Sequence, residues 1–135
     1  MKIKTVPVSR NLYSNYIIKA DEFMAAAQRS FFEEEWNAAA AGAIHSAISA
    51  VDALCVYFLG IRHAGEKHDD AVNLFKTIKI EKEELDKNAR RISRVLSYKN
   101  MAEYEERLVY KSEAENALKD AERILSFVKS KLPKQ

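Results

Sequence analysis

Residues 38–60 read AAAAGAIHSAISAVDALCVYFLG, and this stretch decides the fold of the chain. Its apolar residues recur at the spacing of one helical face, at Ala40, Ala43, Ile44, Ala47, Val51, Leu54, Cys55 and Phe58. A second face carries very small side chains, at Ala38, Gly42, Ser46, Ser49 and Ala53. Because small side chains let another helix approach closely, we predict a central helix that is packed on more than one side.

The composition indicates one all-helical domain. With 135 residues the chain fits a single domain, which we expect to span residues 1–135. It has only 3 glycines and 2 prolines, and because Pro7 and Pro133 sit at the two ends, nothing between them forbids a helix. The 22 basic and 20 acidic residues give a net charge of +2, which does not by itself indicate nucleic acid.

The single cysteine and the longest stretch of low charge bear on the compartment. Cys55 excludes a disulfide within the chain and favours a reducing compartment, and its place on the apolar face predicts a buried, inert thiol. Residues 36–61 are long enough to cross a bilayer, but their Ala, Ser, His and Asp content favours a buried helix. The first ten residues also lack the apolar core of a signal peptide. We therefore expect a soluble, cytoplasmic protein that does not enter a membrane.

The segments around the central helix complete the prediction of the N-terminal half. Residues 1–13 are expected to form an N-terminal arm, extended over residues 1–10. Ser14 can cap a first helix that runs to about Glu34. Gly60 suits the C-terminus of the central helix, because glycine tolerates the left-handed backbone found there.

Three further helices are expected after residue 60. A short one begins near His68, whose side chain is a candidate cap, and a longer one runs over residues 81–109. Ser112, followed three residues later by Glu115, has the pattern of a capping box that opens a fifth helix. The tail, residues 132–135, should fray. Because the connections are short, we predict an all-α, five-helix antiparallel bundle.

The histidines do not indicate a metal site. His45, His63 and His68 include no pair at the i,i+4 spacing of a helical zinc site, and no cysteine assists them. His63 is expected on an exposed loop. His45 interrupts the small-residue face of the central helix, which leaves two interpretations open, a satisfied core or interface residue and a functional one. The chain also lacks a glycine-rich phosphate loop and a nucleophile elbow, and we expect neither metal nor cofactor.

The fourth predicted helix carries the clearest chemical signal. Arg90, Arg91 and Arg94 crowd its first half, and Lys99 follows on its inner, apolar stripe. Lysine is rarely buried without a partner. Two interpretations are therefore open for Lys99: it lines a cleft, or it pairs with Glu103 one turn later.

Two long blocks of the sequence resemble the HEPN domains. Residues 38–75, AAAAGAIHSAISAVDALCVYFLGIRHAGEKHDDAVNLF, are similar to the front of these domains, and residues 95–128, VLSYKNMAEYEERLVYKSEAENALKDAERILSFV, to their back half. The resemblance extends over about residues 14–131. It implies a helical bundle that commonly dimerises, often an RNase or a toxin encoded beside a minimal nucleotidyltransferase.

The resemblance also points to a motif on the fourth helix. Many HEPN domains carry a catalytic arginine, commonly followed by a polar residue, and a histidine after four to six residues. In the matching stretch Lys99 replaces the arginine, Asn100 fits the polar position, and Tyr104 stands where the histidine would be. The triplet Ala102-Glu103-Tyr104 is similar to the ending found in a subgroup of small prokaryotic HEPN proteins. Because a tyrosine cannot take over the acid–base work of histidine at neutral pH, the sequence predicts against metal-independent RNA cleavage.

These observations predict a nucleotide-, RNA- or partner-binding component of a toxin–antitoxin or defence system. The ligand-binding candidates are His45, Arg94, Lys99, Asn100 and Tyr104. We expect the last four to line one anion-accepting groove near a dimer axis. Five residues separate Arg94 from Lys99, so their directions differ by about 140° on a helix and their side chains must bend to meet.

Two alternatives to this function remain open, together with the identity of the partners. One is a metal-independent RNase that uses Lys99 and Tyr104 as a catalytic pair, and the other is a purely structural helical subunit. We predict a homodimer, because the small-residue face and the short third helix provide surfaces that one bundle need not cover. The resemblance adds a minimal nucleotidyltransferase as a candidate partner.

Overall fold

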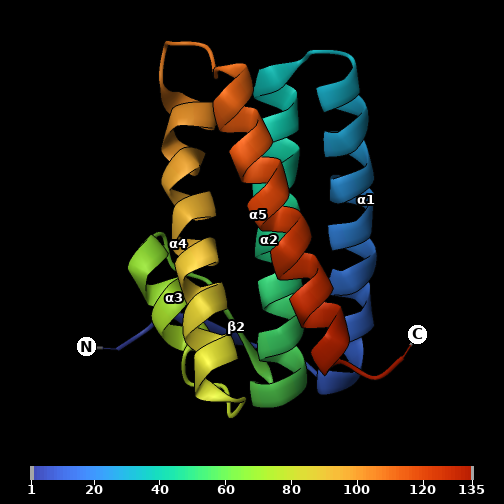
Figure 1. Cartoon of the computed structure of the whole chain (residues 1–135). Helices are drawn as coiled ribbons and strands as arrows, with labels where there is room; N and C mark the ends of the chain where they lie inside the picture. The colour runs from blue at the N-terminus through green and yellow to red at the C-terminus, as the bar shows by residue number, and fades with distance from the viewer. Residues whose placement is uncertain (1, 135) are drawn as a thin grey trace.

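The structure, a computed structural model, describes residues 2–134 and has five helices within them, arranged around α2 (Figure 1). The helices are α1 (Tyr13–Phe32), α2 (Trp36–Leu59), α3 (His68–Phe75), α4 (Lys82–Tyr104) and α5 (Lys111–Lys131). The four long helices lie side by side, consecutive ones running in opposite directions, and the short α3 lies against α4. Because α2 contacts each of the other four, the predicted five-helix bundle with a central helix is confirmed.

The small-residue face of α2 is filled by α1 of the same chain. A Cβ atom added to Gly42 would lie 3.0 Å from the Cβ of Ala27, closer than nine in ten real Cβ contacts. One turn further along α2, the buried Ser46 hydroxyl donates a 2.8 Å hydrogen bond to the Ala20 carbonyl of α1. This face is therefore not available to a second copy of the chain, which removes one of the two reasons given for a homodimer. The homodimer itself stays a prediction.

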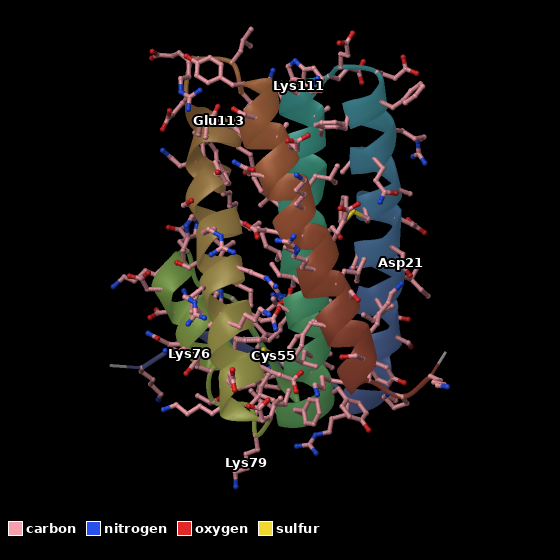
Figure 2. All side chains as sticks on the ribbon, in the orientation of Figure 1. Asp21, Cys55, Lys76, Lys79, Lys111 and Glu113 are labelled. Atoms are coloured by element: carbon pink, nitrogen blue, oxygen red, sulfur yellow. The ribbon has the colours of Figure 1, made fainter. Side chains whose placement is uncertain are left out.

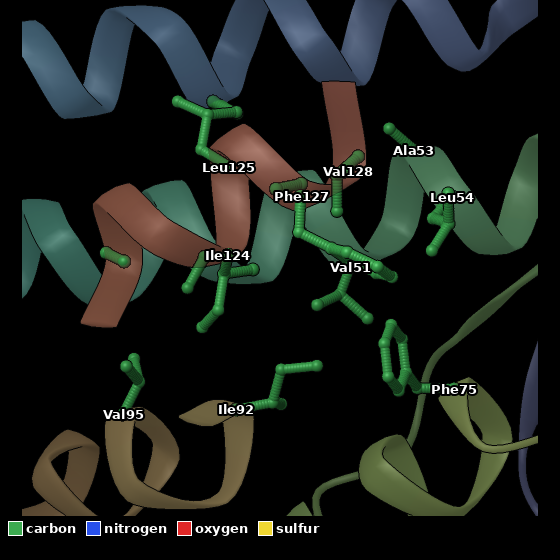
Figure 3. Close-up of a cluster of buried hydrophobic side chains, with 14 of the residues drawn as sticks. Val51, Ala53, Leu54, Phe75, Ile92, Val95, Ile124, Leu125, Phe127 and Val128 are labelled. Carbon is green, nitrogen blue, oxygen red and sulfur yellow. The ribbon is translucent and has the colours of Figure 1, made fainter. Parts of the chain in front are cut away.

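The opposite side of α2 packs into the main core (Figure 3). Apolar side chains from four helices meet there, among them Val51, Leu54, Phe75, Ile92, Val95, Ile124, Phe127 and Val128. The rings of Phe75 in α3 and Phe127 in α5 approach edge to face, with centroids 6.3 Å apart. These contacts fix α3 and α4 against α2, and so determine the space that is left between them.

The N-terminal arm is part of the fold. Strand β1 (Thr5–Pro7) pairs antiparallel with strand β2 (Ile61–His63), so the segment after α2 is a strand where we expected a loop. A 3-10 turn (Arg10–Leu12) then leads into α1. Because α1 begins at Tyr13, Ser14 lies inside the helix and does not cap it. Gly60 ends α2 as predicted, with a φ of 71°.

Several predicted helix ends are wrong by a few residues. Helix α4 ends at Tyr104 and not at residue 109, because the backbone N–H of Val109 turns away to donate to the Asn37 side chain of α2. Helix α5 begins at Lys111, and Glu113, not the predicted pair of Ser112 and Glu115, accepts the backbone N–H of Tyr110 at 2.9 Å. The carboxylate that closes the first turn is thus two residues earlier than the pattern suggested.

Two other local predictions are also corrected. His68 is the first residue of α3, and its side chain makes no cap hydrogen bond. Leu132, in the tail that was expected to fray, is only 8% exposed and belongs to the core cluster. Residues 1 and 135 lie outside the described residues.

The central helix also passes a test for membrane-spanning segments. By length and composition, α2 is apolar enough to cross a bilayer, but 72% of its most apolar window is buried inside the bundle. The core helix of a bundle meets the same criteria, because it too must be apolar along its whole length.

Candidate functional site

A cavity of about 180 Å³ lies between α2, α3, α4 and the segment that joins α2 to α3. Its apolar walls come mainly from α2 and α4, through Ala47, Ile48, Val51, Cys55, Ile92 and Leu96. Its polar groups are Asp52, Arg62, His63, Glu66, His68 and Lys99. The cavity thus combines apolar walls with several titratable groups, which is the usual make-up of a small-ligand site.

Lys99 is the predicted site residue that reaches this cavity. It is half-buried, and within residues 2–134 it has no acidic partner within 4 Å. The alternative pairing with Glu103 is not formed, because Glu103 Oε1 lies 2.9 Å from His45 Nε2 instead. Of the two interpretations left open by the sequence, the structure therefore supports the cleft.

Asp52 is the least expected member of the site. This half-buried carboxylate projects from the most apolar helix, and among the described residues it makes no hydrogen bond or ion pair. Burial raises the pKa of Asp52 to about 7, against a smaller lowering by the positive charges of Arg62 and Lys19. Asp52 also borders a neighbouring hollow beside α1, which is lined by Tyr16, Lys19, Glu22, Phe23, Ser49, Asp52 and Arg62.

Strand β2 brings two more titratable side chains to the cavity, those of Arg62 and His63. Burial lowers the pKa of His63; Asp70 opposes this effect, and the nearby charges of His68, Arg62 and Lys99 add to it. The Nε2 atom of His63 is buried and has no hydrogen-bond partner among residues 2–134, so the prediction of an exposed surface histidine is wrong. The Arg62 guanidinium donates to the His63 carbonyl at 3.2 Å, which leaves its remaining N–H groups available.

The other candidates lie away from the cavity. Arg94 forms two 3.0 Å hydrogen bonds with Asp120 of α5, a bidentate pair that raises the pKa of Arg94. Asn100 is exposed, with its amide 3.4 Å from Glu105, and Tyr104, the last residue of α4, is 72% exposed. Within one chain, therefore, Lys99 shares no groove with Arg94, and Lys99 and Tyr104 do not converge.

His45 belongs to a contact between three helices. Its side chain is 44% exposed, lies 2.9 Å from Glu103 of α4, and has its ring centroid 5.4 Å from that of Phe23 in α1. His45 does not line the cavity that Asp52 and Lys99 border. Of its two interpretations, the interface between helices has the direct support of these contacts.

Cys55 forms part of the cavity wall, yet it is closed to solvent. The residue is 1% exposed, as predicted. Burial, with a smaller contribution from the negative charge of Asp52, raises the pKa of the Cys55 thiol to about 12. The thiol is therefore protonated at neutral pH.

The arrangement can hold an anion, and it shows no metal centre. Arg62 and Lys99 supply positive charge to the lining of the cavity, and Glu66 is the one acidic group in that lining besides Asp52. Over the part of the chain that the structure describes, no three His, Cys, Asp or Glu side chains converge on one point.

The fold and the cavity define a class: a small all-α bundle with a pocket of mixed apolar and titratable lining against its central helix. The sequence pattern of the HEPN domain matches residues 13–131, and the chain therefore belongs to the HEPN domain family. A search of curated protein sequences returns no match. The resemblance read from the two sequence blocks is thus confirmed at the level of the family.

Proposed function

We propose that this chain binds a phosphate group, of a nucleotide or of RNA, at the cavity between α2, α3 and α4. In this proposal it is a non-catalytic subunit of a toxin–antitoxin or defence system. The observation that carries the proposal is the presence of Arg62 and Lys99 at one cavity, without an acidic partner within 4 Å for either among residues 2–134. Cations held near apolar walls attract an anion more strongly than cations in bulk water, because the local dielectric constant is lower.

The departure from the family motif supports binding over catalysis. Lys99 lacks the bidentate fork with which arginine grips phosphate, and Tyr104 does not lie at the same cavity. A lysine that holds phosphate without the arginine and histidine of the family motif accounts for binding, and it leaves cleavage by that motif unexplained.

A pair of matched lysine substitutions tests the proposal. Titration of a fluorescent nucleotide and of a short labelled RNA at low salt should show binding to the wild type. We expect affinity about tenfold or more lower for Lys99→Ala and unchanged for Lys79→Ala. Lys79 is exposed in the connection between α3 and α4, and its side chain points away from the bundle (Figure 2). The substitution Lys79→Ala therefore controls for the loss of one positive charge. Equal affinities for Lys99→Ala and the wild type would remove the cavity from the proposal.

The partners are a second part of this proposal. The α1–α2 and α4–α5 connections lie at the same end of the bundle (Figure 1), and exposed apolar side chains lie in or beside each of them: Phe32 (85% exposed) at the first, and Tyr104 (72%), Leu108 (72%) and Tyr110 (65%) at the second. Exposed apolar side chains of this kind favour contact with another protein chain. We propose a homodimer that works with a minimal nucleotidyltransferase. Light scattering should give about twice the mass of 15.4 kDa, and a monomer at micromolar concentration would contradict the dimer.

One observation favours a metal-independent RNase as a second candidate function. His63 and His68 border the same cavity as Lys99, so imidazole groups are present although the motif lacks its histidine. Incubation of total RNA with the purified protein and a chelator separates the two functions. Intact RNA supports a binding subunit, whereas cleavage that is lost in His68→Ala would support the RNase.

A further inference from the structure

The unpaired carboxylate of Asp52 is not explained by phosphate binding. A phosphate would be attracted by Arg62 and Lys99 and repelled by Asp52, which borders the same cavity. A partly buried acceptor without a partner costs free energy, and such a group is retained where a ligand satisfies it. The ligand should therefore carry hydrogen-bond donors as well as a negative charge.

The surroundings of Asp52 indicate that these donors are neutral. The positive charges of Arg62 and Lys19 act on Asp52 from β2 and α1, and Lys99 of α4 lines the same cavity. A cationic ligand group would be repelled by all three. A neutral N–H group is not repelled, and it gains a charge-assisted hydrogen bond from the carboxylate.

The shape of the cavity adds a constraint on size. Its volume of about 180 Å³ is below the roughly 300–1,000 Å³ of pockets that enclose whole drug-sized ligands. Side chains of α2 and α4, such as Val51 and Leu96, form its apolar walls. By its volume the cavity therefore suits a single ring system, with the charged part of the ligand directed toward the cations.

We propose that the cavity holds the base of a guanine nucleotide, with Asp52 as the residue that recognises it. This inference rests on the proposed phosphate site at Lys99. Guanine is the base that offers two adjacent N–H donors on its Watson–Crick edge, at N1 and N2, and a carboxylate offers two acceptors. Adenine and cytosine place a ring acceptor beside their amino donor, and uracil flanks its single N–H with two carbonyl oxygens. Each of these three bases would direct at least one lone pair toward Asp52.

The test compares three mononucleotides on matched variants. GMP, IMP and AMP are titrated at pH 8 and low salt into the wild type, Asp52→Asn, Lys99→Ala and the control Asp86→Asn, with folding checked by circular dichroism. Asp86 lies on α4, and no contact of its side chain with the cavity exists among the described residues. The pH keeps Asp52 mostly ionised, because its pKa is about 7.

We expect the wild type to bind GMP about tenfold or more tightly than AMP, as a bidentate pair discriminates between bases, with IMP between them because it lacks the N2 donors. Asp52→Asn should abolish this order, whereas Asp86→Asn should keep it. Lys99→Ala should weaken all three nucleotides by the same factor, since the phosphate is common to them.

The outcomes separate this inference from the function beneath it. If Lys99→Ala weakens binding but the wild type does not distinguish GMP from AMP, the guanine site is overturned and the phosphate site stands. If Asp52→Asn keeps the order of the three nucleotides, another residue recognises the base and the inference fails. If none of the nucleotides binds to the wild type, or if Lys99→Ala binds as tightly as the wild type, the proposed phosphate site itself fails. Because the IMP comparison uses the wild type, it holds even if a variant does not fold.

Discussion

The two sides of α2 differ sharply in how they are filled. Toward α1, Gly42 and Ser46 allow such close contact that a single added carbon at residue 42 would meet Ala27 at 3.0 Å. Toward α4, a cavity remains, and a carboxylate, Asp52, borders it without a partner among residues 2–134. Both sides belong to one helix within about ten residues, so the difference comes from the side chains that each face carries and from the neighbours of that face.

The two sides of α2 affect the stability of the bundle in opposite directions. Contacts at van der Waals distance add dispersion energy and exclude water, so the α1 side stabilises the bundle. The α4 side gives up part of that stability, because an unpaired carboxylate is less stable there than in water. An arrangement that lowers stability is expected where a site must accept a ligand.

The largest expected effect is a loss of stability when a larger side chain is placed in the close contact between α2 and α1. Gly42→Leu places a branched side chain against Ala27, and because α1 cannot approach as closely, we expect the free energy of unfolding to fall by about 3 kcal/mol. Urea denaturation measures the change. Ala38→Leu, at an exposed position of the same helix, should alter stability by less than about 0.5 kcal/mol. A small change for Gly42→Leu would show that the contact with α1 yields easily.

The second largest effect is a gain in stability, and it is expected from a substitution of Asp52 on the cavity side of α2. The pKa of Asp52 is about 7 in the folded chain and has an ordinary value of 3.8, so the folded state holds this proton more tightly than the unfolded state. Stability is therefore lost as the pH rises from about 4 to about 7, and the loss is complete above pH 7. Asp52→Asn removes this loss. Because solvent reaches part of the carboxylate, we expect a gain of about 1–3 kcal/mol at pH 8.

Urea denaturation at several pH values checks the prediction for Asp52. The gain of Asp52→Asn over the wild type should shrink as the pH falls from about 7 toward the ordinary pKa of 3.8, because the carboxyl is then protonated in the folded state and increasingly protonated in the unfolded state. Asp86→Asn should show no such trend. A stability gain of Asp52→Asn that is independent of pH would mean that the amide stabilises the chain through its own contacts. The ionised carboxylate would then not be destabilised by burial.

The same comparison shows why the sequence predicted one side of α2 better than the other. The run of small residues and the final Gly60 are local signals, and both produced correct predictions about the helix and its close neighbour. The cavity depends in part on β2, which pairs with β1 and contributes Arg62 and His63 to the lining. That pairing joins distant segments with no periodicity long enough to reveal it.

The site residues divide in the same way. Lys99 was found because a lysine on an apolar stripe breaks a helical pattern. A lone carboxylate in the most apolar helix is the same kind of signal, and it would have identified Asp52. Arg94 was assigned to the groove by its distance along the chain, but Asp120 of α5 turns it to the other side of α4. Side-chain partners on another helix cannot be read from spacing on one.

A smaller effect is expected from Lys99 on the cavity side of α2, in the dependence of affinity on salt. Each phosphate contact releases counterions, so the logarithm of the affinity falls with the logarithm of salt concentration. Replacement of Lys99 by alanine should make this slope shallower by about one, while Lys79→Ala leaves it unchanged. Titrations between about 50 and 200 mM salt measure both slopes. Parallel slopes for the wild type and Lys99→Ala would mean that Lys99 does not neutralise a phosphate.

The smallest effect is expected at Cys55, which lies where the packed core meets the cavity wall. Because the thiol is 1% exposed and its pKa is about 12, a thiol reagent should label it in the native state only as fast as the bundle opens. Burial contributes more to this pKa than the charge of Asp52, so Asp52→Asn should leave the labelling slow. Mass spectrometry over time, with a urea-unfolded sample as the fully reactive control, follows the reaction. Rapid labelling of the native protein would show that the cavity floor is open to small molecules, and the difference between the two sides of α2 would then extend into the core.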